Sequence, residues 1–384
     1  MIITDLQLKH FRNYASEQFD FSDHINVITG ANAQGKTNLL EALFFLARGY
    51  SHRATTVADL VQFEQPAFFA RAGVWQDGTH HEICVRYENR RKVLTIDGKK
   101  EPKHAAAGKI VHIILFEPDD LRIVKAGPEK RRRFMNEEIS GHMPSYLPVL
   151  GHYRKALAQR NALLKEIRHA ASLQTLLAGW DAQLVHYGAR LIRYRQAYLK
   201  RLNAVAKQLH SGLSDGRETL QLSYHNNVID QPADQEAIAR RFDERLKASV
   251  EEDIARGSTA TGPQVDDMQV CIDGRDARKY ASQGQQRTAA IALKLSQIEI
   301  YRRATGDWPI VLLDDILSEL DAARQEQILA ILGRTQAFIT CTDSQFAERY
   351  PDAMKRVLTI QDGHWISDGV IRIKQQNPAP ERVD

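Results

Sequence analysis

Short apolar runs and alternating apolar positions predict strands over the first third of the chain. Ile2, Leu6 and Leu8 fall on one face of an N-terminal strand, and the run 24–29 (HINVIT) is apolar enough for a buried strand. Further strands are expected on the stretches FFARAGVW, HEICVRYE, KVLTIDG and IVHIILF, between residues 66 and 116. The dipeptide Asp97-Gly98 predicts a hairpin turn among them.

Helical periodicity appears first at 38–47 (NLLEALFFLA) and then dominates from about residue 145. One apolar stripe runs from Leu150 to Ala171 and a second from Leu177 to Leu209, with alternating spacings of three and four. This spacing predicts two helices packed along each other and joined near 170–174. An antiparallel helical arm and ordinary amphipathic bundle helices fit the stripes equally well.

The last third mixes helices with short apolar strands. We expect helix up to about residue 256 and at 285–303, and strands at 268–272, 310–313, 336–340 and 357–366. The segment 371–384 contains two prolines and no apolar pattern, which predicts a disordered tail.

Composition narrows the class of protein. The chain has 384 residues, of which 43% are hydrophobic and 26% charged, as in a globular protein with a large core. Its three cysteines (Cys84, Cys271 and Cys341) are too scattered for disulfides or a zinc site, which favours a reducing compartment. The N-terminus does not read as a secretion signal, and no apolar run approaches the roughly 20 residues that span a bilayer. A cytoplasmic protein without a membrane partner is expected.

A phosphate-binding motif follows the strand at 24–29. A glycine-rich turn before a helix points backbone N–H groups at a phosphate, and its lysine and hydroxyl reach the β/γ oxygens and Mg²⁺. A strand before the motif and a helix after it are the context that this chemistry requires. ATP is therefore the expected ligand and Mg²⁺ the expected metal. The predicted ATP-binding residues are Gly30, Ala31, Asn32, Ala33, Gln34, Gly35, Lys36, Thr37 and Asn38.

The apolar run 310–313 ends in Asp314 and Asp315. An isolated pair of this kind is usually a loop or a helix cap. Beside a P-loop, an aspartate at the end of a buried strand is the usual second protein oxygen for Mg²⁺, here together with Thr37. We therefore predict Asp314 as a metal ligand, and Asp315 as the catalytic residue that orients or deprotonates the attacking water. Lys36 completes the predicted catalytic set.

Two further segments distinguish among P-loop classes. The segment Ser282-Gln283-Gly284-Gln285 precedes a predicted helix and can bind a second anion, although alone it is an ordinary cap. The segment Ser318-Glu319-Leu320-Asp321 follows the aspartate pair.

In this order the motifs resemble those of an ABC-type ATPase head of the SMC kind. Over residues 1 to about 370 the chain resembles the RecF family in particular. The further matching stretches are Phe11-Arg12-Asn13-Tyr14, Phe116 to Leu121, Gly127-Pro128 with Arg131 to Phe134, Gln159-Arg160-Asn161, and Gly262-Pro263 with Asp266-Asp267.

The resemblance implies an α/β fold: a P-loop ATPase head whose mixed sheet has central parallel strands, with an inserted α-helical lobe. The ATPase lobe is then expected over 1–145, carrying the P-loop, and over 256–370, carrying the aspartate pair and the family's signature motif, here Ser282-Gln283-Gly284-Gln285. The helical lobe is expected over 146–255.

The resemblance also implies a mechanism. ATP joins two copies head to tail, so Ser282, Gly284 and Gln285 act in trans and Asp321 lies at the dimer seam. Arg12 matches a position that contacts the nucleotide phosphates. Hydrolysis is slow and DNA-stimulated. The family's role is recombinase loading at single-strand gaps and SOS induction, with RecO and RecR as partners.

Four positions depart from the expected pattern. Gln264-Val265 stands where the family usually has His-Arg. Asp315 replaces the glutamate of most ABC ATPases, which is consistent with slow hydrolysis. Thr342 replaces the switch histidine of transporters, and a hydroxyl cannot shuttle a proton at neutral pH.

The net charge of +4 permits DNA binding, and basic residues cluster. Between residues 152 and 201 the chain contains ten Lys or Arg residues and only two acidic residues. Further basic clusters occur at 131–133 and 90–103. Each cluster alone is more often a solvated face. Together they favour binding to single-stranded, gapped or junction DNA through its backbone. The candidate contacts are Arg190, Arg193, Arg195, Arg131 and Arg132.

Other P-loop classes explain less. A GTPase would need a guanine-reading Asn-Lys-x-Asp motif that we do not find, and neither a kinase nor a GTPase accounts for residues 282–285. The ATPase subunit of a transporter predicts a glutamate at 315 and a histidine at 342. A long-armed SMC protein needs a far longer helical insertion.

Overall fold

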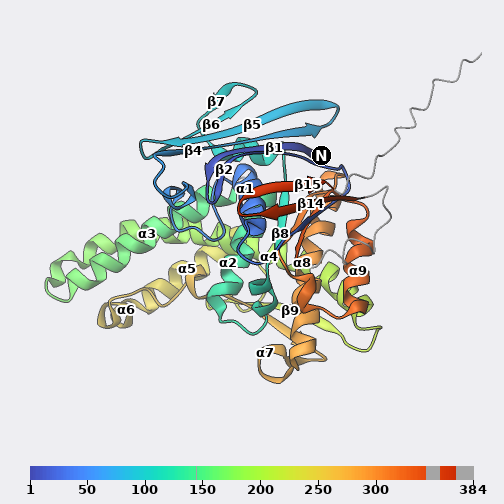
Figure 1. Cartoon of the computed structure of the whole chain (residues 1–384). Coiled ribbons are helices and arrows are strands. Elements are labelled where there is room, and N and C mark those ends of the chain that lie inside the picture. The colour runs from blue at the N-terminus through green and yellow to red at the C-terminus, as the bar shows by residue number, and fades with distance from the viewer. Residues whose placement is uncertain (144, 343–354, 369–384) are drawn as a thin grey trace, which may run out of the picture. The chain divides into compact units, whose positions relative to one another are not determined.

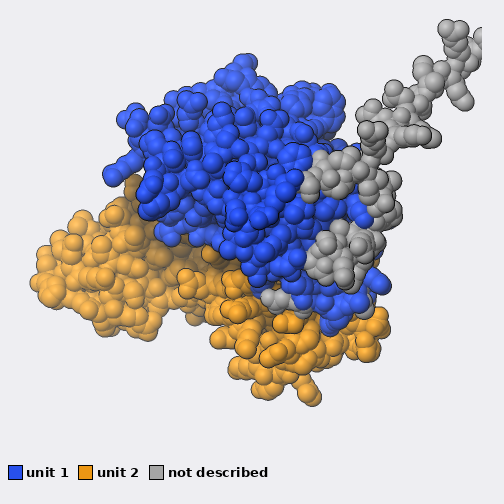
Figure 2. All heavy atoms as spheres, in the orientation of Figure 1, with its two compact units in different colours: residues 1–118, 307–384 blue, residues 119–306 orange. Residues whose placement is uncertain are grey.

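The computed structural model describes residues 1–143, 145–342 and 355–368, so the predicted tail 371–384 lies outside the described residues. The chain forms two compact units, coloured separately in Figure 2. Unit 1 comprises residues 1–118 and 307–384, and unit 2 comprises residues 119–306.

Unit 1 contains a six-stranded antiparallel sheet in the order β2-β1-β4-β5-β6-β7. The hairpin turn predicted at Asp97-Gly98 joins its last two strands. Figure 1 shows this sheet near the N-terminus. Its strands are β1 (Ile2–Phe11), β2 (Tyr14–Asp20), β4 (Ala67–Gln76), β5 (Thr79–Glu88), β6 (Arg91–Ile96) and β7 (Lys99–Glu101).

A second sheet in unit 1 has the order β15-β14-β3-β13-β12-β8, in which only β15 is antiparallel to its neighbour. Its strands are β3 (Ile25–Thr29), β8 (Ile113–Phe116), β12 (Ile310–Leu313), β13 (Ala337–Cys341), β14 (Lys355–Gln361) and β15 (His364–Asp368). The prediction of a mixed sheet with central parallel strands is therefore confirmed. β3, β8 and β12 are buried at every position, as their apolar runs require.

Helix α1 (Lys36–Arg48) joins the two sheets into one core. Its buried Leu39 and Phe45 belong to the same apolar cluster as Leu6 and Phe68 of the first sheet and Phe338 of the second. This burial holds the start of α1 at the edge where the parallel strands end. The other helical segments of unit 1 are η1 (Val57–Leu60), η2 (His104–Lys109), η6 (Leu317–Glu319) and α9 (Ala322–Leu332), while η3 (Pro118–Arg122) crosses the unit boundary.

Unit 2 is mainly helical. Helices α3 and α4 pack on each other and are joined by η4, so the predicted helical pair is confirmed (Figure 1). α6 packs on α3, and α4 also contacts α5 and α8, so the pair is partly an arm and partly a bundle. The helical elements are α2 (Pro128–His142), α3 (Tyr146–Ile167), η4 (Ala171–Leu176), α4 (Leu177–Leu213), α5 (Gln235–Ala248), α6 (Val250–Arg256), η5 (Pro263–Val265), α7 (Ala277–Tyr280) and α8 (Gln283–Thr305).

A small antiparallel sheet, β11-β10-β9, completes unit 2. Its strands are β9 (Leu220–His225), β10 (Asp267–Ile272) and β11 (Arg275–Asp276). β9 was not among the expected strands. From the sequence, residues 256–306 were expected in the ATPase lobe. In the structure they belong to unit 2, because β10 pairs with β9 and α8 packs along α4. Residues 119–145 join the same unit, since α2 contacts both β10 and α4.

No helix in the described part of the chain is both long and apolar enough to cross a membrane.

Candidate nucleotide-binding site

The turn after β3 depends on two glycines. Gly30 has φ 147°, and a Cβ on it would lie 2.3 Å from the carbonyl oxygen of Ile360 on the neighbouring β14. Gly35 has φ 120°, and its Cβ would lie 2.7 Å from the side chain of Asn13. Only glycine fits such close approaches at these φ angles, so both positions define the path of the loop.

Hydrogen bonds hold the loop in place from outside. The Asn13 amide donates to the Gln34 carbonyl at 2.9 Å, and the Tyr14 hydroxyl donates to the Gly35 carbonyl at 2.9 Å. The backbone N–H of Gly363, in the turn between β14 and β15, donates to the Gln34 carbonyl at 3.0 Å. The stretch Phe11 to Tyr14 and the turn at 362–363 therefore support the P-loop from two sides.

Lys36 folds back over this loop. Its ammonium donates to the carbonyls of Gly30 at 2.6 Å and Ala31 at 2.8 Å. Burial lowers the pKa of Lys36, and the nearby Asp315 and Asp314 oppose that shift. The charge is thus held on the loop, where phosphate oxygens would replace the two carbonyls as its partners.

Asp314 and Thr37 meet on the same side of the loop. Asp314 Oδ1 accepts hydrogen bonds from Thr37 Oγ1 at 2.9 Å and from Thr340 Oγ1 at 2.9 Å. Burial raises the pKa of Asp314, and these two hydroxyl donors oppose the increase. Hydroxyl and carboxylate oxygens are the hard ligands that Mg²⁺ takes, so the pair fits such an ion.

Asp315 is held in an unusual backbone conformation. It has φ 51°, in the left-handed region, and its N–H donates to Thr340 Oγ1 at 2.8 Å. Its carbonyl accepts from Ser318 Oγ at 2.6 Å. Asp314 and Asp315 therefore differ in their surroundings, although they are adjacent in the sequence.

These groups line one cavity of about 350 Å³ within unit 1. Its size lies in the range of small-molecule sites. Its lining residues are Asn32, Ala33, Gly35, Lys36, Thr37, Asn38, Arg53, Asp314, Asp315 and Thr340. The structure therefore brings together the P-loop and both aspartates from opposite ends of the sequence.

Two arginines depart from the sequence analysis: Arg53 lines the cavity although it was not predicted to, and Arg12 was predicted to contact the nucleotide. Arg53 lines the cavity and donates to Asn38 Oδ1 at 3.1 Å, but its loop carries no periodic or motif signal that would have revealed it. Arg12 does not line the cavity. Its guanidinium makes two hydrogen bonds to the buried Glu41, at 2.9 and 2.8 Å, and a third to the Asp59 carbonyl at 2.7 Å. A phosphate contact by Arg12 would require exchange of these bonds.

The predicted signature lies in unit 2, at the start of α8. Ser282 is the N-cap, and its Oγ accepts from the Gln285 N–H at 3.2 Å. Gln285 Oε1 accepts in return from the Ser282 N–H at 2.8 Å, which completes a capping box. Ser282 and Gly284 are exposed. They are not part of the cavity lining in unit 1.

Asp321 caps helix α9 of unit 1. Its Oδ1 accepts from the Arg324 N–H at 3.0 Å, and its carboxylate pairs with the Arg324 side chain. The backbone donor lowers the pKa of Asp321. Its side chain is about half exposed, so it is accessible at the surface of unit 1.

Two of the predicted DNA contacts are wrong, because their side chains are buried ion pairs. Arg131 is 4% exposed and donates hydrogen bonds to both carboxylate oxygens of Asp267, at 2.7 and 2.8 Å. Arg195 is 2% exposed and donates to Asp266 at 2.7 Å and to the Pro263 carbonyl at 2.6 Å. Neither guanidinium can reach a phosphate without breaking the interior of unit 2.

The other predicted DNA contacts differ in exposure. Arg132 is half-buried and donates to the Asp266 carbonyl at 2.8 Å. Arg190 is half-buried, and Arg193 is exposed on α4. Lys200 is also exposed and lies about two turns further along the same helix.

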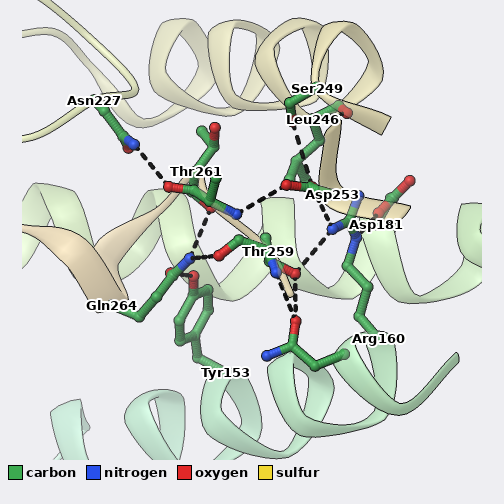
Figure 3. Close-up of polar contacts among 12 residues, drawn as sticks. Tyr153, Arg160, Asp181, Asn227, Leu246, Ser249, Asp253, Thr259, Thr261 and Gln264 are labelled. Carbon is green, nitrogen blue, oxygen red and sulfur yellow. Dashed lines mark hydrogen bonds and ion pairs between the residues drawn. The ribbon is translucent and has the colours of Figure 1, made fainter. Parts of the chain in front are cut away.

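A polar network inside unit 2 uses further residues of the motif stretches (Figure 3). The fully buried Arg160 donates to Asp181 at 2.6 Å, to Asp253 at 2.7 Å and to Thr259 at 2.8 Å. Gln264, at one of the positions that depart from the expected pattern, donates to the Thr259 carbonyl at 3.1 Å and accepts from Tyr153. Its side chain therefore ties the loop before β10 to α3.

A P-loop between β3 and α1, an aspartate pair after β12 and a long helical insertion define an ABC/SMC-type ATPase head. Residues 2–365 match the family model described as "RecF/RecN/SMC N terminal domain". A head of an Smc protein from Pyrococcus furiosus shares this fold at TM-score 0.55 and 16% identity, over 95% of each chain.

Closer relatives are RecF proteins. "DNA replication and repair protein RecF" of Symbiobacterium thermophilum is 43% identical over 89% of this chain and 92% of its own. That of Lachnoclostridium phytofermentans is 41% identical over 89% and 93%. A solved structure of "recombination mediator protein RecF-ATPrS in RecFOR pathway" superposes at TM-score 0.89 with 34% identity, over 96% of this chain and 98% of the other. The RecF-ATP structure of the same series gives TM-score 0.86 at 34% identity, with the same coverage. The chain therefore belongs to the RecF family of DNA replication and repair proteins.

Proposed function

We propose that this chain is an ATP-dependent recombination mediator whose ATP-bound form closes as a dimer on DNA. The observation that carries the proposal is the hydrogen bond between Thr37 and Asp314 beside Lys36, within a single cavity. RecF relatives described with ATP support ATP as the ligand.

ATP would lie with its phosphates along the N–H groups of residues 31–37. Lys36 would exchange the carbonyls of Gly30 and Ala31 for phosphate oxygens, which recovers two charge-assisted bonds. Thr37 and Asp314 would hold Mg²⁺, which neutralises phosphate charge when bound. No group of three or more His, Cys, Asp or Glu in the described parts of the chain could hold a metal alone, so phosphates and water would supply the remaining ligands.

Asp315 would orient or deprotonate the water that attacks the γ-phosphate. Its left-handed backbone and the bond from its N–H to Thr340 hold the carboxylate next to Asp314. As the shorter of the two acids used at this position, it reaches less far than a glutamate. Slow hydrolysis is the expected consequence. We further propose that DNA stimulates it, so that hydrolysis limits the lifetime of the complex and does not drive movement.

One chain would supply only half of the composite site. Ser282, Gly284 and Gln285 of a second copy would complete the site at the γ-phosphate, and Asp321 would lie at the seam. The exposure of Ser282 and Gly284 supports this role, because the N-terminus of a helix offers N–H groups to an anion. ATP would then join the two copies, and hydrolysis would separate them.

The substrate would be single-stranded, gapped or junction DNA, bound through its backbone. Exposed cations such as Arg193 and Lys200 support that contact. Recombinase loading at gaps and SOS induction, together with RecO and RecR, would be its role. Membership of the RecF family and the RecFOR pathway named for the solved relative support this part of the proposal.

The test is a light-scattering titration with ATP and Mg²⁺, with and without gapped DNA. The wild type should dimerise with ATP, and gapped DNA should lower the ATP concentration required. Ser282→Arg should bind ATP normally but stay monomeric, whereas Ser211→Arg, at an exposed serine of α4, should dimerise like the wild type. Undiminished dimerisation of Ser282→Arg would contradict the role in trans.

A further inference from the structure

The amide of Gln285 makes a hydrogen bond at each end within its own chain. Its Oε1 accepts from the Ser282 N–H at 2.8 Å, and its Nε2 donates to Oε1 of Glu218 at 3.1 Å. Glu218 lies in the segment between α4 and β9, remote in sequence from the signature. We propose that Glu218 is a positioning residue for the signature turn, acting through Gln285 to fix how Ser282 is presented to the nucleotide of a second copy. The inference rests on the proposed function in trans.

The chemistry of the three groups allows only one orientation of the amide. The Ser282 N–H can only donate, and an ionised Glu218 can only accept. An amide carries one acceptor and one donor end, so Oε1 must face Ser282 and Nε2 must face Glu218. The reverse orientation would set a donor against a donor and an oxygen against a carboxylate. Glu218 thereby selects the rotamer that closes the capping box.

A buried histidine lies next to the other oxygen of the carboxylate. His210, in the last turn of α4, is fully buried, and its Nε2 lies 3.5 Å from Oε2 of Glu218. Burial lowers the pKa of His210, and the nearby Glu218 opposes that shift. The contacts run in order from α4 through His210 and Glu218 to Gln285, all within unit 2. The end of the long helix is thus connected to the start of α8.

The neighbouring glutamine has a different task. Gln286 is buried and donates to the carbonyls of Ala277 at 3.0 Å and Ala281 at 3.3 Å, which anchors α8 to the preceding turn. Gln285, in contrast, bonds to Ser282 within the signature turn itself. Ser282 and Gly284 are then the groups left to face a partner, while Gln285 acts on ATP only through the turn that it shapes.

A substitution at Glu218 should separate dimerisation from nucleotide binding. Glu218→Ala should weaken the ATP-induced dimer at least roughly tenfold and slow turnover to match, since loss of a charge-assisted hydrogen bond frees the amide. The ATP affinity of the monomer, set in unit 1, should not change. Asp215→Asn, which removes another carboxylate from the same segment, should leave both quantities at the wild-type level.

An exchange of the two side chains gives the decisive measurement. Gln285→Glu alone should be as defective as Glu218→Ala, because two carboxylates then face each other. Combining Gln285→Glu with Glu218→Gln should restore dimerisation, since the new carboxylate accepts from both Ser282 and the new amide. A double variant as defective as Gln285→Glu alone, or a Glu218→Ala protein that dimerises normally, would overturn the assignment.

Ser282→Arg separates this inference from the proposed function. If Ser282→Arg still dimerises with ATP, the role in trans fails and the role of Glu218 fails with it. If Ser282→Arg is monomeric but Glu218→Ala dimerises normally, only the role of Glu218 falls. Thermal melting of each variant shows whether a loss of dimers reflects unfolding, in which case the exchanged pair decides the matter.

Discussion

The hydroxyl of Thr37 donates a 2.9 Å hydrogen bond to Oδ1 of Asp314, across a sequence separation of 277 residues. The contact exists because β3 and β12 both pair in parallel with β13, so the carboxyl ends of the two strands lie at the same edge of the sheet. The P-loop and the aspartate pair are therefore parts of one site.

Asp314→Asn should raise stability while abolishing turnover. Burial raises the pKa of Asp314 in the folded protein above its unfolded value of 3.8. The folded state therefore favours the neutral carboxyl. The stability that this preference contributes is fully present below pH 3.8 and is lost as the pH rises through the folded pKa. The amide oxygen still accepts from Thr37 and Thr340, without a buried charge. Without nucleotide or Mg²⁺ at pH 7, we expect Tm to rise by about 2 °C. An unchanged Tm in calorimetry would contradict this account.

Asp315→Asn should trap the ATP-bound dimer. Removal of a general base costs roughly 10²- to 10⁴-fold in rate, while Asn tolerates the left-handed backbone that Asp315 adopts. Asp315→Ala should lose the same activity and in addition about 1 kcal/mol of stability, because alanine is strained at φ 51°. Single-turnover hydrolysis and chemical denaturation measure the two effects. Normal turnover by Asp315→Asn would remove this residue from catalysis.

Gly30→Ala should disrupt the P-loop from behind. The new Cβ would lie 2.3 Å from the Ile360 carbonyl, so β14 or the loop must move. We expect ATP affinity to fall at least roughly tenfold, and stability to fall by more than the cost of alanine at positive φ, about 1 kcal/mol. Gly78→Ala is the matched control, since Gly78 has φ 75° and no atom within 4 Å of a new Cβ. Equal losses in the two variants would show that the clash is unimportant.

Arg160→Ala should be among the most destabilising single changes in unit 2. It leaves Asp253, which is fully buried, without its ion-pair partner at 2.7 Å. Breaking such a pair from one side costs about 3–5 kcal/mol. Arg256→Ala removes an exposed pair with Glu252 on α6 and should cost less than about 1 kcal/mol. Urea denaturation compares the two, and a small effect for Arg160→Ala would mean that Asp253 finds other donors.

Arg193→Ala should weaken DNA binding, whereas Arg195→Ala should lower the stability of unit 2. Arg193 is exposed on α4, so its removal should weaken DNA binding uniformly and reduce the salt slope by about 1, without loss of stability. Arg195 pairs with the buried Asp266, so its removal should destabilise unit 2 by about 3–5 kcal/mol. Salt titrations of DNA affinity beside thermal melts test the pair. A normal salt slope for Arg193→Ala would exclude that residue from the interface.

The elements of the site that lie in continuous motifs could be predicted from the sequence. The strand, turn and helix over 25–48 and the buried strand before Asp314 follow from local periodicity and from apolar runs that only a parallel sheet accommodates. Their proximity also follows, since parallel strands end at a common edge.

Pairings between distant residues could not be predicted in the same way. Arg131 and Arg195 count as positive charges in the sequence, but Asp267 and Asp266 neutralise them from positions 136 and 71 residues away. Arg53 reaches the cavity from a loop without periodicity. β9 alternates over only six residues between polar segments, and its pairing with β10 is what makes it a strand.

The position of β3 between β13 and β14 also bears on biosynthesis. β3 leaves the ribosome early, but both of its partners come from beyond residue 336. A nascent chain therefore carries an apolar strand with two open edges through most of translation, which is a form that invites aggregation or chaperone binding. The ATP pocket cannot close until nearly the whole chain has been made, so only a chain translated past β14 can respond to ATP.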